Sequence, residues 1–211
     1  WGQIKPWLMT SGSQFRPEPP PAFEASAEYF RDLDEVRAYS SLSATDPVRI
    51  EQLRIARYWA TGPAVGDPGY VPGWSTAGFF GRLASNLITR QNLDERRAAR
   101  TYAVMYMAMM DASIACYDAK YFYQYIRPFQ ADPTILTPVG RPNFPSYPSA
   151  HSCLTSAALG ALGGMFPPAA DDLRLVIVRE PRLRQDHAVL AVRLEANWIV
   201  LDNRRLVLLE D

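Results

Sequence analysis

The stretch KYFYQYIRP, residues 120–128, places two basic residues in an apolar and aromatic setting. Lys120 and Arg127 are seven residues apart, which is two turns of a helix, so both are expected on one face. No acidic residue lies between them, and Pro128 marks the end of the helical pattern. The stretch therefore predicts the last turns of a helix that carries two cations without an acidic partner between them.

Helical patterns continue on both sides of this stretch. The helix that ends here is predicted to begin at Asn92, because Asp94 and Glu95 are typical of a first helical turn. Asp46 followed by Pro47 likewise indicates a helix start. The other predicted helices cover residues 25–60 in two segments, 74–91 and 149–165. Residues 1–25 are rich in proline, so we expect an extended arm that lies on the domain.

The pattern changes near residue 171. The runs LRLVIV, HAVLAVRL, WIVLDN and RLVLL are β-branched and leucine-rich and have the length of strands. We therefore predict a mainly α protein, a helical bundle followed by a short C-terminal β-hairpin fragment. The predicted domains are residues 1–170 and 171–211.

Composition excludes several classes of function. The 211 residues include 22 Lys and Arg against 22 Asp and Glu, a balance that does not favour nucleic acid as a partner. The most apolar segment, residues 102–117, is short and contains Asp111, so we predict no membrane span. Two cysteines without a CxxC motif argue against a disulfide scaffold or a zinc ribbon. Because the first residue is Trp1, we expect a processed chain or a piece of a longer one.

A second polar cluster lies in FPSYPSAHS, residues 144–152. Ser149 is the expected N-cap of the next helix, and His151 lies in its first turn. A helix N-terminus presents unpaired N–H groups to an anion, and Lys120 and Arg127 would add charge to the same site. The set suits a tetrahedral oxyanion, and His151 could donate a proton to it. The missing partner of the two cations would then be a phosphate-like ligand.

These two motifs, K-x6-R-P at 120–128 and P-S-A-H at 148–151, resemble those of the type 2 phosphatidic acid phosphatase and vanadium-dependent haloperoxidase superfamily. The resemblance covers about residues 1–170 and implies a helical bundle of that type. It implies that Lys120, Arg127, Ser149 and the Ala150 amide bind phosphate or vanadate oxygens, and that His151 is the catalytic acid–base. Vanadate is the implied cofactor of a haloperoxidase, whereas a phosphatase needs none, and no other metal is implied.

The superfamily also has a third motif, S-R-x5-H-x3-D, which this sequence lacks. The second histidine, His187, has Pro181 and Ala191 where arginine and aspartate are required. We therefore expect a bundle truncated before that motif, with oxyanion binding weakened and turnover impaired. The implied partners are a small phosphoester, or peroxide and halide, and the resemblance also allows a homo-oligomer. It implies a periplasmic or secreted location.

The C-terminal tail, DHAVLAVRLEANWIVLDN, resembles the closing hairpin of bacterial transglutaminase-like cysteine proteinases. That resemblance implies a possible second site with a His187 and Asp202 pair, which a turn near residues 195–196 would make diagonal neighbours. Its nucleophile is absent from the tail. A gene fusion, a deletion or a misassembled reading frame would explain two incomplete enzymes in one chain. The alternative function is therefore a cysteine-peptidase remnant or a non-catalytic fused fragment.

Plainer roles exist for the same residues. Lys120 and Arg127 could extend their charged ends from an amphipathic helix into solvent. We expect the aromatic residues 121–123 and 125 to be core or pocket wall, and Asp118 to be a surface carboxylate. Cys116 and Cys153 are expected to be small buried residues, because no basic partner is evident for either thiol. Whether the chain is an enzyme stays open at this point, as does the choice between phosphatase and haloperoxidase.

Overall fold

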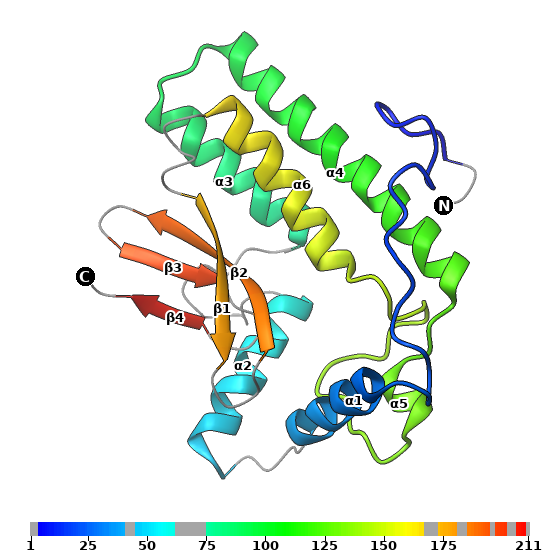
Figure 1. Ribbon diagram of the computed structural model, residues 1–211. Coiled ribbons are helices and arrows are strands. Elements are labelled where there is room, and N and C mark those ends of the chain that lie inside the picture. The colour runs from blue at the N-terminus through cyan, green and yellow to red at the C-terminus, as the bar shows by residue number, and fades with distance from the viewer. Residues whose placement is uncertain are drawn as a thin grey trace. The chain divides into compact units, whose positions relative to one another are not determined.

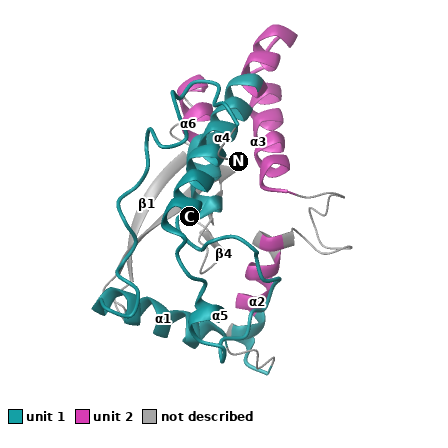
Figure 2. Ribbon diagram, turned by 90° about the vertical axis from the view of Figure 1, so that its right-hand side faces the viewer, with its two compact units in different colours: residues 1–50, 103–158 teal, residues 51–102, 159–211 magenta. Residues whose placement is uncertain are grey.

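The computed structural model describes residues 4–40, 45–61 and 75–166, together with the backbone of four C-terminal strands (Figure 1). Its larger part is helical, as the sequence predicted. The chain divides into two compact units, each built from two separate segments (Figure 2). Residues 1–50 and 103–158 form unit 1, and residues 51–102 and 159–211 form unit 2.

Unit 1 contains α1 (Ala27–Ser40), α5 (Pro128–Ala131), most of α4 (Glu95–Tyr123) and the first half of α6 (Ala150–Met165). The long helix α4 ends before the position predicted from Pro128. Gln124 has φ of 47°, in the left-handed region, and its N–H donates to the Lys120 carbonyl at 2.9 Å. This conformation closes the last turn of α4 and directs the chain away from the helix axis. Arg127 therefore lies beyond α4, as the residue that precedes α5.

The N-terminal arm lies along α4, as the sequence predicted (Figure 1). Asp111 is buried in the middle of α4 and accepts hydrogen bonds from the backbone N–H groups of Trp7, Leu8 and Met9 at 2.7–3.1 Å. At Gly12 the arm runs so close to α4 that a Cβ there would lie 3.1 Å from the Cβ of Asp118. The arm is thus fixed by buried polar contacts with α4.

A small apolar cluster closes the other end of unit 1. Tyr29 and Leu33 of α1 pack with Ile135, and Tyr125 and Phe129 cover the cluster. This cluster joins α1 to the loop that follows α4, which holds the chain on both sides of Arg127. Burial of such side chains contributes about 1.5–3 kcal/mol each to the free energy of unfolding.

Unit 2 contains α2 (Pro47–Thr61) beyond Ile50, α3 (Thr76–Arg90), the first turns of α4 and the end of α6. Ser75 is the N-cap of α3, and its side chain accepts the Gly78 N–H at 3.0 Å. The hydroxyl groups of Ser85 and Tyr102 form a hydrogen bond of 2.7 Å between α3 and α4. None of the described helices combines the length and apolar character that a membrane crossing requires.

The four strand-like runs of the tail coincide with four strands. These are β1 (Leu173–Glu180), β2 (Gln185–Leu194), β3 (Asn197–Leu201) and β4 (Leu206–Leu209). They form an antiparallel sheet in the order β1-β2-β3-β4, which is larger than the predicted hairpin. Leu194 of β2 lies opposite Asn197 of β3. The turn predicted at residues 195–196 lies outside the described residues. The predicted boundary near residue 171 stays a prediction.

Candidate functional site

Lys120 is the most deeply buried cation of the described residues, with 1% of its surface exposed. Its ammonium group donates to the carbonyl oxygens of Pro145 and Ser146 at 2.8 and 3.1 Å. Among the described residues, these two carbonyl groups are the hydrogen-bond acceptors that the structure gives for the ammonium group. The side chain does not extend into solvent, and the interpretation as a solvated helix cation is wrong for Lys120.

Arg127 also donates hydrogen bonds to this loop. Its Nε donates to the Phe144 carbonyl at 2.7 Å, and one terminal nitrogen donates to the Pro145 carbonyl at 3.3 Å. A guanidinium carries five N–H donors, so these two bonds leave others for a ligand. Lys120 and Arg127 thus share the Pro145 carbonyl. The structure brings the two cations together at this loop, although Arg127 lies beyond α4 and not on the predicted helix face.

Phe144 completes the surroundings of the two cations. Its ring centroid lies 5.1 Å from the Lys120 ammonium and 4.9 Å from the Arg127 guanidinium carbon. Both distances are within the range of cation–π attraction. The loop is held in place by Ser146, whose N–H donates to the Tyr125 carbonyl at 2.9 Å and whose hydroxyl donates to the Ile126 carbonyl at 2.8 Å.

The partners of the two cations therefore include three backbone carbonyl groups and an aromatic ring. Sequence reasoning missed this role of the loop, because carbonyl groups carry no signal in a sequence. Burial lowers the pKa of the Lys120 ammonium, and the neighbouring Arg127 charge lowers it further. Burial also lowers the pKa of Arg127. An anion beside this pair would relieve the cost of burying two positive charges.

The N-terminus of α6 carries the remaining predicted residues. The Ser149 hydroxyl accepts the Ser152 N–H at 3.3 Å, and the Ser149 carbonyl accepts the Cys153 N–H at 3.1 Å, which confirms Ser149 as the N-cap. Ala150 is the first helical residue, and His151 follows it with an exposed side chain. The binding roles predicted for Ser149 and Ala150, and the catalytic role of His151, stay predictions.

The two cysteines lie next to this site. Cys116 is one helical turn before Lys120 on α4, and its thiol donates to the Pro148 carbonyl at 3.9 Å. Cys153, in the first turn of α6, raises the pKa of the Cys116 thiol, and Cys116 lowers the pKa of the Cys153 thiol to about 7. The Lys120 charge lowers the pKa of both thiols, although it is not the largest influence on either. The spacing of Cys116 and Lys120, four residues apart on one helix face, was the signal that could have indicated this.

Two further predictions need correction. Asp118 is not simply a surface carboxylate, because it is half-buried and binds Arg16 of the arm at 2.6 Å. Tyr121 and Phe122 are exposed rather than core. The Phe122 ring instead contacts Arg16, whose guanidinium carbon lies 3.7 Å from the ring centroid.

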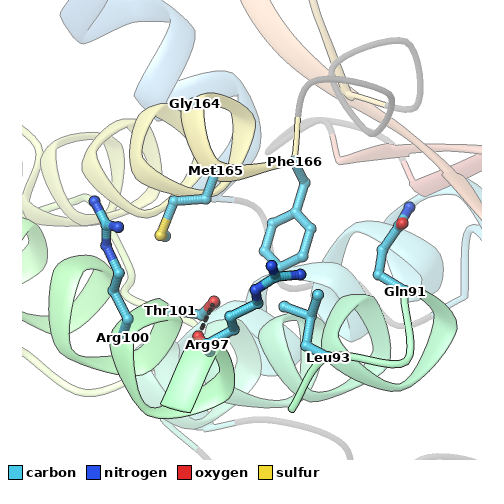
Figure 3. A pocket seen from close by; sticks show the side chains of 8 residues that line it. All are labelled: Gln91, Leu93, Arg97, Arg100, Thr101, Gly164, Met165 and Phe166. Carbon is cyan, nitrogen blue, oxygen red and sulfur yellow. Dashed lines mark hydrogen bonds between the residues drawn. The ribbon is translucent and has the colours of Figure 1, made fainter. Parts of the chain in front are cut away.

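A separate pocket of about 470 Å³ lies in unit 2. Arg97, Arg100 and Thr101 of α4 line one side, and residues 164–166 at the end of α6 line another, as Figure 3 shows. None of the predicted site residues lines this pocket. The Thr101 hydroxyl donates to the Arg97 carbonyl at 3.0 Å, so this polar group is used within α4.

The second predicted pair lies in the C-terminal sheet. His187 is in β2, opposite Val178 of β1. Asp202 lies outside the described residues, so its relation to His187 stays a prediction. Cys116 and Cys153, the two cysteines of the sequence, lie in unit 1 beside Lys120.

Comparison with known proteins finds that this chain is similar to vanadium haloperoxidases. A family model described as the second helical-bundle domain of vanadium chloroperoxidase matches residues 100–137, a segment that contains Lys120 and Arg127. The crystal structure of a bacterial vanadium-dependent iodoperoxidase matches with a TM-score of 0.66 and 29% sequence identity. The resemblance to the vanadium haloperoxidases is therefore confirmed. No curated protein matches the chain.

The matches to haloperoxidases cover only part of the proteins compared. The structural match covers 79% of this chain but 41% of the iodoperoxidase, so the chain spans less than half the length of that enzyme. The fold is thus a haloperoxidase-like helical bundle. The family model ends before Ser149 and His151, so it reaches the first motif and not the second.

The residues fit part of what a vanadate cofactor needs. Lys120, Arg127 and the α6 N-terminus supply donors suited to a tetrahedral oxyanion held by hydrogen bonds. Direct ligation needs a histidine as well, and His187 does not lie in the sequence context of the third motif. Among the described residues, no cluster of three acidic, histidine or cysteine side chains could hold a metal ion.

Proposed function

We propose that the chain binds a phosphate-like oxyanion, phosphate or vanadate, between Lys120, Arg127 and the N-terminus of α6. The observation that carries this proposal is a buried lysine and a half-buried arginine that share one loop without any carboxylate partner among the described residues. Two buried positive charges are costly, and a multiply charged anion is the partner that offsets them best. The haloperoxidase relation supports the same assignment.

Each donor of the site would have its own role in binding the anion. Lys120 would contribute an N–H and its charge, and Arg127 the N–H groups that the loop carbonyls leave open. Ser149 and the Ala150 amide would close the site from the helix terminus, where the macrodipole also favours an anion. His151, one residue further, would exchange a proton with an oxygen of the bound group.

The similar proteins indicate only the general class of reaction. We infer an enzyme of the haloperoxidase or acid phosphatase type, which uses peroxide and halide or a small phosphoester. The S-R-x5-H-x3-D motif is absent from this sequence. Turnover should therefore be weak, because groups that act as a unit lose most of their rate when one is missing. A periplasmic or secreted location belongs to the same proposal.

Calorimetric titration with inorganic phosphate tests the binding site directly. Ser149→Ala should weaken phosphate binding about tenfold, because it removes one hydroxyl donor. Ser156→Ala is the matched control, since Ser156 is an exposed serine of the same helix. Equal affinities for both variants and the wild type would overturn the placement of the anion at the α6 terminus.

Two activity assays then separate the reaction classes. Hydrolysis of an aryl phosphate and peroxide-dependent oxidation of iodide in the presence of vanadate are measured on the same preparation, with His151→Ala as the variant. Activity in either assay that His151→Ala lowers by about 100-fold or more supports the acid–base role. Activity that the substitution leaves unchanged would contradict it.

A further inference from the structure

Ser146 is a polar residue of the site loop to which the proposed function assigns no role. Its hydroxyl donates to the Ile126 carbonyl at 2.8 Å, and its N–H donates to the Tyr125 carbonyl at 2.9 Å. The residue is half-buried. Ser146 therefore fastens the loop that both cations contact to the segment between α4 and α5.

The hydroxyl of Ser146 acts on the peptide group that precedes Arg127. The Ile126 carbonyl and the Arg127 N–H belong to this one peptide group, and a peptide group is planar. Holding its carbonyl therefore fixes the direction in which the Arg127 residue begins. The N–H of the same group donates to the Gln130 side-chain oxygen at 3.1 Å, but Gln130 is exposed. Ser146 is the half-buried partner, and it ties this peptide group to the site loop.

The backbone of Ser146 contacts the other cation. Its carbonyl accepts a hydrogen bond from the Lys120 ammonium at 3.1 Å, and the neighbouring Pro145 carbonyl accepts from both cations. The next residue, Tyr147, donates its hydroxyl to the Glu18 carbonyl at 2.8 Å, which holds the loop on the arm. One residue thus contacts Lys120 through its carbonyl and the peptide group before Arg127 through its hydroxyl.

We propose that Ser146 is a positioning residue of the anion site, whose hydroxyl holds Arg127 beside Lys120 so that both cations bind the same oxyanion. This inference rests on the proposed function and adds a residue to the same site. The single hydroxyl proton is donated to the Ile126 carbonyl, with the Tyr125 carbonyl farther away at 3.4 Å. The anion therefore receives no hydrogen bond from Ser146, which acts on it through Arg127.

The size of the effect follows from the cost of ordering a binding group. Without the hydroxyl, the peptide group before Arg127 is held less firmly, and the guanidinium has to be ordered when the anion binds. Groups that are ordered before binding give higher affinity than groups that are ordered by it. One hydrogen bond of usual net strength corresponds to about a tenfold change in a dissociation constant.

The experiment is a calorimetric titration of the full chain with inorganic phosphate. It compares the wild type with Ser146→Ala, Arg127→Lys and the double variant. Ser146→Ala should weaken phosphate binding about tenfold. Arg127→Lys keeps the positive charge, so residual binding can be measured in it. In that background Ser146→Ala should change the affinity by no more than about twofold, because the group that it positions is gone.

Ser85→Ala is the matched control for a purely structural role. Ser85 is also a half-buried serine, its hydroxyl donates to the Gly81 carbonyl at 2.9 Å, and it lies in unit 2. Its substitution removes a similar hydrogen bond and should leave the phosphate affinity unchanged. Urea denaturation checks that each variant folds. If Ser146→Ala does not unfold cooperatively, Ser146→Cys takes its place, because a thiol has a similar shape and donates only weakly.

The outcomes separate this inference from the proposed function. If Arg127→Lys weakens phosphate binding, three results would overturn the role of Ser146 alone. These are wild-type affinity in Ser146→Ala, equal weakening by this substitution in both backgrounds, and equal weakening by Ser85→Ala. A wild type that does not bind phosphate, or an affinity that Arg127→Lys leaves unchanged, would overturn the proposed function and this inference with it.

Discussion

The sequence predicted a functional role for Lys120 but not its hydrogen-bond partners. Its position seven residues before Arg127 was sufficient to predict a shared face and a missing acidic partner. In the structure the two cations do meet, but at the carbonyl groups of residues 144–146. The predicted shared helix face is wrong, because α4 ends at Tyr123, before Arg127. Which backbone carbonyl groups accept these hydrogen bonds depends on how the loop folds, and the residue types in the sequence do not indicate it.

Asp111 is a second residue whose role the sequence did not show. Its position in an apolar helix argued against a membrane span, yet three N–H groups of the arm bind it. Burial by itself would raise the pKa of Asp111, but these hydrogen bonds outweigh burial and lower it. A carboxylate in the middle of α4 is therefore stable because a distant segment supplies its donors.

Replacing this carboxylate should weaken the whole of unit 1. We expect Asp111→Asn to lower the free energy of unfolding by about 2 kcal/mol. An amide has one acceptor oxygen instead of two, and the two N–H donors of its NH2 group would face N–H donors of the arm. Urea denaturation followed by fluorescence measures this. Asp32→Asn, at an exposed position of α1, is the control and should change stability little. Equal stability of both variants would contradict the role of Asp111.

Asp132 allows a prediction of pH dependence. The Thr134 hydroxyl and then the Arg37 guanidinium lower the pKa of this carboxyl to about 2, below the ordinary value near 3.9. The unfolded state therefore binds more protons between these values, so the stabilisation is present above about pH 4 and lost as pH falls towards 2. Wild type and Asp132→Asn should differ in stability at pH 6 and converge near pH 2. A difference independent of pH would contradict this account.

At the scale of elements, the helices were predictable and their ends less so. The patterns at residues 46–60 and 149–165 lie within one or two residues of α2 and α6, because capping residues such as Ser149 act locally. The end of α4 was misplaced, since Pro128 indicated a limit and the left-handed Gln124 ends the helix earlier. A non-glycine residue with positive φ has no reliable signal in a single sequence.

The arm is the element whose fixation can be tested most simply. Tyr123 and Tyr125 donate their hydroxyls to the Pro17 and Pro21 carbonyls at 2.6 and 2.7 Å. Each Tyr→Phe substitution should cost about 0.5–1.5 kcal/mol and expose the arm to limited proteolysis. Tyr121→Phe is the control, because Tyr121 is half exposed. Cleavage of the arm at the same rate in all three variants would contradict the proposed attachment.

For the whole molecule, the sequence predicted the helical bundle through two motifs and their helical context, and the haloperoxidase match supports that architecture. The extent of the C-terminal sheet was harder to predict, because strand runs show their length but not how many neighbours each one pairs with. The two-unit division was also not predicted, since it cuts across α4 and α6. Periodicity within a helix carries no information about which of its turns belong to which unit.

The central claim is that Lys120 and Arg127 hold an oxyanion, and a thermal melt with millimolar orthovanadate tests it most directly. A ligand at 100 times its dissociation constant adds about 2.7 kcal/mol to the stability of the folded state, so the wild-type melting temperature should rise by several degrees. Arg127→Lys should lose most of this shift, because lysine cannot replace the forked donors. Arg31→Ala, at an exposed position of α1, should keep it. A cooperative melt that vanadate leaves unchanged, or an equal shift in Arg127→Lys, would contradict the account.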